Sequence, residues 1–240
     1  MSIKTRLVDY RDGDLVFQGM LAWDDDVDGP RPGVLVAHTI RGRSAFEESK
    51  AEMLAEQGYV GFAIDVYGKD AIGSQIEECR EMMDALRSER PVLQRRLLRA
   101  LRTMQDQPEV DSIRVAAIGY CFGGLCVLDI ARTGEPIAGV ISFHGLFNPP
   151  GNTAGNRIAA RVLALHGWDD PLATPDQAVA LGEELGSMGA DWQLHCYGNV
   201  RHAFTNPAAD ASTGVTIYNQ SADRRSWAAA RYFLSELFGT

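Results

Sequence analysis

Ile113-Arg-Val-Ala-Ala-Ile-Gly-Tyr-Cys-Phe-Gly-Gly124 is the stretch of sequence that decides the fold. Its apolar first half is typical of a buried strand, and the apolar run 125–131 that follows is typical of a helix. Between the two, Gly119-Tyr-Cys121-Phe-Gly123 has the glycine spacing of a nucleophile elbow, a sharp strand-to-helix turn, with cysteine in place of serine. Side chains at positions 119 and 123 would collide with neighbouring backbone. The stretch therefore predicts a cysteine thiol held at the end of a strand.

A helix that begins next to Cys121 would change the chemistry of its thiol. The positive end of the helix dipole favours negative charge on the sulfur, and the thiolate is the reactive form of cysteine. The backbone N–H groups of the first helical turn, that of Phe122 first, could receive the oxyanion of a tetrahedral intermediate. The alternative is that the glycines only permit close packing and that Cys121 is a small buried hydrophobic residue, as free cysteines usually are.

Two later strands are each followed by a candidate partner for Cys121. The expected strand 161–165 leads into a loop that carries Asp170, and the expected strand 191–197 leads to His202. Because each interval spans about one strand–helix–strand unit, the three side chains would meet at the carboxyl ends of their strands. There the imidazole can take the thiol proton, and the carboxylate can orient the imidazole.

The rest of the chain alternates short apolar runs with amphipathic segments. An opening hairpin is expected from 4–10 and 15–23, with Asp-Gly as the turn signal between them. Apolar runs that do not alternate with polar residues indicate a parallel sheet covered on both faces. The later runs are 34–37, 59–64, 113–118, 137–143, 161–166 and 191–197, and further helices are expected at about 91–107, 175–187 and 221–238.

This alternation predicts one α/β domain over residues 1–240. Its sheet is expected to be mostly parallel and doubly wound, with helices on both faces and an N-terminal antiparallel hairpin at the edge. One helix start is marked by Ser44 and Glu47, which have capping-box spacing, and Gly58 stands where that helix would end.

The composition excludes several classes of protein. The 240 residues contain 23 Lys and Arg against 32 Asp and Glu, and this net charge of −9 excludes a general nucleic-acid binder. No apolar run reaches the ~18–20 residues of a membrane span, and the N-terminus lacks the apolar core of a signal peptide. The four cysteines form no C-x-x-C pair. We therefore expect a cytoplasmic protein with no membrane or nucleic-acid partner.

No cofactor and no metal are expected from the motifs. Gly119–Gly124 does not match G-x-G-x-x-G because position 121 is cysteine, and the chain has no Walker A sequence. No cluster of His, Cys and carboxylates has zinc spacing. The acidic turn at 24–29 begins like an EF-hand loop, but its twelfth position is Leu35 instead of the bidentate glutamate.

Three of these segments together resemble the dienelactone hydrolase family of the α/β-hydrolase superfamily. They are Gly119-Tyr-Cys-Phe-Gly-Gly124, His166-Gly-x-x-Asp170 and His202-Ala-Phe204. The stretch Gln57-Gly-Tyr…Ile64-Asp-Val-Tyr67 also looks like the second core strand of that family. The resemblance extends from about residue 32 to the C-terminal helix and implies the α/β-hydrolase fold.

The resemblance also implies an activity and its residues. It implies a cysteine hydrolase whose catalytic triad corresponds to Cys121, Asp170 and His202 in this sequence. It further implies two backbone N–H groups in the oxyanion hole, one from Phe122 and one from Ile40 in the loop after the strand at 34–37.

The sequence departs from the family at two positions that bear on the substrate. Members that open dienelactones carry a glutamate just before the oxyanion residue, where it helps to deprotonate the thiol, and here Thr39 occupies that position. Those members also have an arginine four residues after the triad histidine, which binds the substrate carboxylate, and here the residue is Asn206. A neutral ester is therefore expected as the substrate, and His202 must activate Cys121 alone.

Other side chains could line the same cleft. His38 and His144 both follow strands, and either could touch the substrate. Thr39, Trp168 and Asn206 are the remaining candidates for substrate contacts.

Several neighbours of the candidate residues are expected to be structural. Asp169 competes with Asp170 for the role of the acid, but the G-x-x-D spacing favours Asp170 and leaves Asp169 as a solvated neighbour. His166 and His195 lie within or at the end of strands and are expected to be structural, and Cys126 is expected in the core.

The sequence thus predicts a metal-independent hydrolase of carboxylic esters or lactones that acts on a small molecule through a thioester acyl-enzyme at Cys121. A related alternative is hydrolysis of neutral phosphotriesters at the same site. Two further alternatives come from other classes of protein. Cys121 could be oxidised in a thiol redox or sensing protein, or the fold could serve only for binding.

Overall fold

The computed structural model describes residues 1–69, 71 and 75–239. Packing divides the chain into two compact units, Met1–Ile118 and Gly119–Thr240. The boundary between the units falls inside strand β5 (Val110–Tyr120). Both units alternate strands with helices along the chain, as the sequence predicts.

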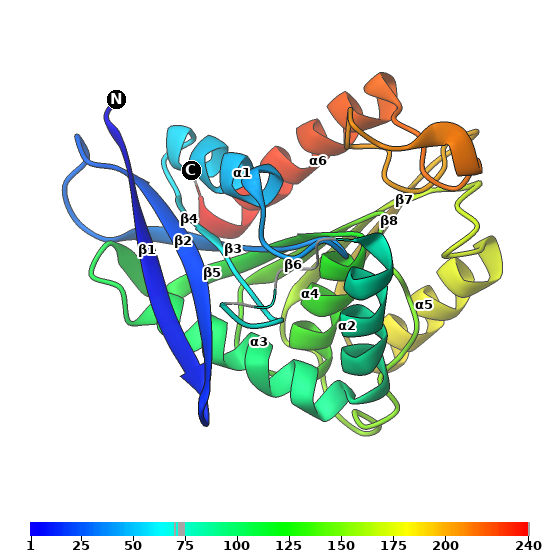
Figure 1. The fold of residues 1–240 in the computed structure, drawn as a ribbon, viewed down its shortest axis with the longest axis horizontal. Helices are drawn as coiled ribbons and strands as arrows, with labels where there is room; N and C mark the ends of the chain where they lie inside the picture. The colour runs from blue at the N-terminus through cyan, green and yellow to red at the C-terminus, as the bar shows by residue number, and fades with distance from the viewer. Residues whose placement is uncertain (70, 72–74, 240) are drawn as a thin grey trace. The chain divides into compact units, whose positions relative to one another are not determined.

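The strands of the first unit follow the order β1-β2-β4-β3-β5. Antiparallel pairing joins β1 to β2 and β2 to β4, whereas β3 and β4 are parallel. Helix α1 lies on one side of these strands and α3 on the other (Figure 1), and α2 packs against α3. The elements are β1 (Ile3–Asp12), β2 (Leu15–Asp24), β3 (Arg31–Ala37), α1 (Ala45–Glu56), β4 (Val60–Ala63), α2 (Ile76–Ser88), α3 (Arg90–Gln105) and β5.

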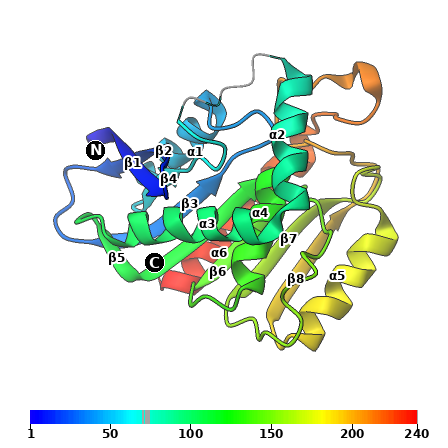
Figure 2. The ribbon, with the colours of Figure 1, turned by 60° about the horizontal axis from the view of Figure 1, so that its bottom comes forward.

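The second unit contains the end of β5 and three parallel strands in the order β6-β7-β8. Helix α6 covers one face of these strands, and α4 and α5 cover the other (Figure 2). Every residue of β6 is buried, which explains its continuous apolar sequence. The elements are α4 (Phe122–Arg132), β6 (Gly139–Phe143), β7 (Arg161–Gly167), α5 (Pro175–Ser187), β8 (Asp191–Tyr197), the short 3₁₀ turn η1 (Ala211–Thr213) and α6 (Gln220–Phe238).

The predicted N-terminal hairpin is confirmed, with longer strands than expected. Asp12 pairs directly with Leu15, so the turn contains Gly13 and Asp14 alone. Gly13 has a φ of +62°, which a glycine adopts without steric cost and which a two-residue hairpin turn requires. The strands could therefore continue to the turn itself.

The helix boundaries agree well wherever the sequence has a capping signal. The Ser44–Glu47 capping box is present at the start of α1, and Gly58 has a φ of +89° just beyond its end. Helix α5 has the predicted bounds. Helix α2 was not expected from the sequence, although Cys79, Met83 and Leu86 form a buried stripe at helical spacing.

One further property concerns membranes. Among the residues that the structure describes, no helix is both long enough and apolar enough to cross a bilayer.

Candidate active site

The predicted elbow is present at the junction of β5 and α4. Cys121 adopts a φ of +57° and a ψ of −115°, a strained conformation for a residue with a side chain, and α4 begins at the next residue. A Cβ atom on Gly119 would lie 2.0 Å from the carbonyl oxygen of Gly123, and one on Gly124 would lie 2.6 Å from the Cα of Gly145. The glycines therefore permit the tight turn, and the partly exposed thiol of Cys121 is held at the start of a helix.

The structure brings His202 and Asp170 together in the same unit. The Nδ1 atom of His202 lies 2.7 Å from Oδ2 of Asp170, and both side chains are almost completely buried. The other carboxylate oxygen of Asp170 accepts a hydrogen bond from the Leu172 N–H at 2.8 Å. Asp169 is exposed instead. Because the pair fixes the proton on Nδ1, the Nε2 atom of His202 is the nitrogen that remains for catalysis.

The charge on His202 depends on both of its neighbours. Burial alone lowers the pKa of a histidine because it disfavours the charged form. Here the negative charge of Cys121 and the Asp170 carboxylate outweigh burial and raise the pKa of His202 to about 10. The site therefore favours the imidazolium form of His202.

Phe122 is the residue for which the sequence predicts an N–H group in the oxyanion hole. It is the first residue of α4 and is fully buried. The start of a helix carries the positive end of its dipole.

The other oxyanion candidate, Ile40, belongs to the first unit, in the loop that follows β3. The carbonyl oxygen of Ile40 accepts a hydrogen bond from the Tyr67 hydroxyl at 3.0 Å. His38 is buried, and its Nδ1 lies 2.6 Å from the carbonyl oxygen of Thr39 while its Nε2 accepts the Val66 N–H at 3.2 Å. The carbonyl groups of Thr39 and Ile40 are therefore each held by a side chain of the first unit.

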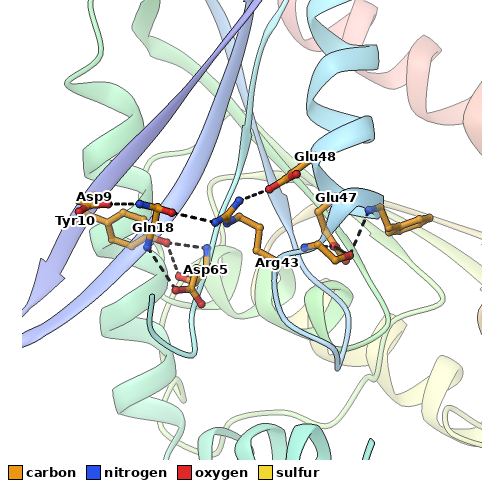
Figure 3. A network of polar contacts seen from close by, with 9 residues as sticks. Asp9, Tyr10, Gln18, Arg43, Glu47, Glu48 and Asp65 are labelled. Carbon is orange, nitrogen blue, oxygen red and sulfur yellow. Dashed lines mark hydrogen bonds and ion pairs between the residues drawn. The ribbon is translucent and has the colours of Figure 1, made fainter. Parts of the chain in front are cut away.

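Glu47 holds the same loop and was not expected to be part of the site. Its carboxylate is fully buried and accepts the Thr39 N–H at 3.0 Å through Oε1. Its Oε2 accepts the backbone N–H of Ser44 at 3.0 Å and the hydroxyl of Ser44 at 2.7 Å. Figure 3 shows the Glu47 side chain near the start of α1. The capping-box spacing indicated only a helix start, yet this carboxylate joins both ends of the loop.

A second set of polar contacts ties this loop to the hairpin. Arg43 forms an ion pair with Glu48 and also donates to the Gln18 side chain at 3.4 Å. Gln18 in turn donates from its amide to Asp9 at 2.8 Å, and its backbone N–H lies 3.5 Å from a carboxylate oxygen of Asp65. The chain of contacts is visible in Figure 3 and links β1, β2 and α1 within the first unit.

The other residues predicted to contact the substrate are His144, Trp168 and Asn206, and they differ in burial and in hydrogen-bond partners. His144 is buried at the end of β6, where its ring lies 5.2 Å from the His202 ring between centroids. Its Nε2 lies 2.8 Å from the hydroxyl of Thr205, a residue that the sequence did not single out. Trp168 is 40% exposed beside the acid loop, and the Asn206 side chain accepts the Ala208 N–H at 3.0 Å.

Metal binding has no candidate site in the described part of the chain. Across residues 1–69, 71 and 75–239, no group of three or more His, Cys, Asp or Glu side chains could hold a metal ion.

Comparison with known proteins agrees with this architecture. The model of the dienelactone hydrolase family matches residues 17–238. A carboxymethylenebutenolidase from Pseudomonas putida is 29% identical over 201 residues, which cover 80% of this chain and 83% of that protein.

Two solved structures are similar over nearly the whole chain. One is a dienelactone hydrolase-like promiscuous phosphotriesterase from metagenomic libraries, with a TM-score of 0.93 and 37% identity over 99% of this chain and 100% of the other. The other, named m3DLH, has a TM-score of 0.94 and 36% identity with the same coverage. These likenesses confirm the predicted α/β-hydrolase fold, a mostly parallel sheet with an antiparallel hairpin at its edge.

Proposed function

The chain belongs to the dienelactone hydrolase family and is a hydrolase acting on ester bonds, and from that premise we propose that it cleaves carboxylic esters or lactones with Cys121 as the nucleophile. His202 and Asp170 complete the proposed triad. The observation that carries this assignment is the buried His202–Asp170 pair, 2.7 Å apart, in the same compact unit as the strained Cys121.

The first half of the reaction forms a thioester. The Cys121 thiolate attacks the carbonyl carbon of the ester, and the carbonyl electrons move to oxygen, where the Phe122 N–H stabilises the negative charge. The family resemblance adds the Ile40 N–H as the second donor. When the intermediate collapses, the C–O bond breaks and the leaving alcohol takes the proton from Nε2 of His202. The acyl group is then bound to sulfur.

The second half releases the acid. His202 is now neutral and takes a proton from water as the water oxygen attacks the thioester carbon. The C–S bond breaks, the thiolate leaves, and His202 keeps the proton, so that the ion pair is restored. Asp170 remains ionised throughout and keeps the imidazole in the orientation that both proton transfers require.

Neutral esters are the proposed substrates. Thr39 has no ionisable group with which to assist the thiol, and Asn206 offers no positive charge to a substrate carboxylate. We assign Trp168 to the rim of the site because it is exposed beside the acid loop. Because a reducing compartment keeps free thiols from forming disulfides, the proposed location is the cytoplasm.

The thioester itself provides the sharpest test. We expect that enzyme quenched in acid during turnover of 4-nitrophenyl butyrate carries a butyryl group, and that peptide mapping by mass spectrometry places it on Cys121. The Cys196→Ser variant is the matched control because Cys196 is an exposed thiol on β8, and it should carry the same adduct. Turnover with the acyl group on another residue would contradict the proposal. An oxidised Cys121 without any adduct would favour the thiol-sensing alternative.

Phosphotriester hydrolysis is a second candidate function. The similarity to a promiscuous phosphotriesterase, at 37% identity over 99% of this chain, specifically favours it. The same thiolate can attack the phosphorus of a neutral triester, with the P–O bond to the aryl group breaking and His202 protonating the leaving oxygen. Water then cleaves the S–P bond.

Matched substrates with the same leaving group test this second function. We expect 4-nitrophenyl butyrate to be hydrolysed faster than diethyl 4-nitrophenyl phosphate, because the oxyanion hole fits a planar carbonyl that becomes tetrahedral. Both rates, followed by 4-nitrophenol release, should fall together in the Cys121→Ala variant. Loss of only the carboxylic ester activity in that variant would show that the phosphotriester reacts elsewhere.

A further inference from the structure

Strained backbone collects around His202. Among the described residues, positive φ angles outside glycine occur at Cys121 (+57°), at His144 (+38°), at Asn199 (+58°) and at Ala203 (+57°), the residue directly after His202. Such conformations cost energy and persist only where the surroundings fix them. The elbow explains the strained backbone of Cys121. The proposed triad reaction gives no reason for the strained backbone of His144.

The side chain of His144 joins the end of β6 to the loop that carries His202. The backbone N–H of His144 donates to the Leu165 carbonyl at 2.8 Å, which fixes the residue against β7. Its Nε2 lies 2.8 Å from the hydroxyl of Thr205, three residues beyond His202. His144 and Thr205 are only 2% and 1% exposed, so this hydrogen bond is shielded from water.

Aromatic packing surrounds the same hydrogen bond. The His144 ring meets His202 edge-on, with centroids 5.2 Å apart, and meets Phe204 edge-on at 5.1 Å. The backbone of the loop has its own partners, because Ile217 donates to the His202 carbonyl at 2.9 Å and Asn219 donates to the Phe204 carbonyl at 3.1 Å. The hydroxyl of Thr205 thus adds a contact from the loop to β6.

The electrostatics keep His144 neutral. Burial, and then the positive charge of the neighbouring His202, lower the pKa of His144 well below its ordinary value. A neutral ring can form the hydrogen bond to Thr205 without placing a second positive charge beside His202.

We propose that the hydrogen bond between His144 and Thr205 positions His202 so that its Nε2 meets the Cys121 sulfur. This inference rests on the proposed function, because it assigns the two side chains as positioning residues for that triad. Small displacements of a catalytic group cause large losses of rate because the reacting atoms must be held near their reactive geometry.

Thr205→Val tests the proposal with little change of shape, since valine replaces the hydroxyl with a methyl group. We expect kcat for 4-nitrophenyl butyrate to fall about tenfold, with KM changed less than about twofold. Thr205→Ser keeps the hydroxyl and should stay within about twofold of the unmodified enzyme in kcat. The pH dependence of Cys121 alkylation by iodoacetamide should shift to higher pH in the valine variant, because the imidazolium no longer stabilises the thiolate as well.

His144→Phe removes the same hydrogen bond from the other side. We expect a similar fall in kcat, and the double variant with Thr205→Val should be no slower than either single variant, because one interaction is lost in all three. Thermal denaturation of each variant provides the control for folding. If Thr205→Val does not fold, His144→Phe supplies the same test.

Two outcomes would overturn the inference. The hydrogen bond would be merely structural if Thr205→Val lost stability but kept kcat and the alkylation profile. The hydroxyl would be irrelevant if the serine variant lost as much rate as the valine variant. Failure of the proposed function would give a different result. Cys121→Ala would then retain full esterase activity, whether residue 205 is threonine, serine or valine.

Discussion

Replacement of His202 by alanine is expected to lower kcat/KM for a neutral aryl ester by about 10⁴-fold or more, the range of losses caused by removal of a triad histidine. His202 is the proposed proton acceptor and donor in both half-reactions. It is also the positive partner of the Cys121 thiolate. Alanine therefore removes both the proton transfer and the positive charge beside the nucleophile in one substitution. Release of 4-nitrophenol under conditions of excess substrate measures the loss.

The pH dependence of the same variant separates these two effects. In the unmodified enzyme, the pKa of His202 is raised to about 10, so the imidazolium is present from low pH and is lost as pH rises through that value. We expect the alkaline fall in activity near this pH, as a property of the Cys121–His202 pair together. Without His202, residual activity should instead rise with pH as a larger fraction of the thiol becomes thiolate.

Two further variants complete this experiment. His195→Ala is the matched control, because His195 lies partly exposed on β8 and has no role in the proposed triad, and its activity should stay close to that of the unmodified enzyme. The double variant Cys121→Ala/His202→Ala should be no slower than either single variant, because residues that act as one unit are not additive. Nearly full activity in His202→Ala would refute the triad.

Local sequence was enough to predict the elbow and the alternation of strands and helices along the chain. The glycines around Cys121 are required by contacts within a few residues of each other, such as the 2.0 Å approach of a Cβ on Gly119 to the Gly123 oxygen. The choice of Asp170 over Asp169 depended on spacing within one loop. The structure gives Asp170 the hydrogen bond to His202, so this preference agrees with the observed pairing.

Residues that act across long sequence separations could not be predicted in the same way. Thr205 meets His144 from 61 positions away, and no local pattern distinguishes its hydroxyl from any other. Glu47 had a visible local role in the capping box, which concealed its second role as acceptor for Thr39. These roles arise because loops from distant parts of the sequence come together in the fold. The hydrophobic periodicity of a single sequence does not show which loops do so.

Arg132 is a buried charged residue of the second unit, and its replacement is expected to cause a large loss of stability. It lies in the last turn of α4 and is completely buried. Its guanidinium donates to both carboxylate oxygens of Glu184 on α5, at 2.9 and 2.6 Å, and lies 3.3 Å from the carboxylate of Asp129. It also donates to the Phe147 carbonyl at 3.1 Å. One side chain thus joins two helices to the loop after β6.

Arg132→Met is therefore expected to lower the free energy of unfolding by about 3–5 kcal/mol, because it leaves the buried Asp129 carboxylate without its positive partner. Methionine fills much of the same volume, so the effect is one of charge and hydrogen bonding more than of a cavity. Urea denaturation followed by fluorescence measures the change. Arg161→Met is the matched control, since Arg161 pairs with Glu236 at 3.1 Å but is 42% exposed, and such surface pairs contribute about 0–1 kcal/mol. If both variants lost the same small amount, the Arg132 cluster would not stabilise the fold in the way that its burial indicates.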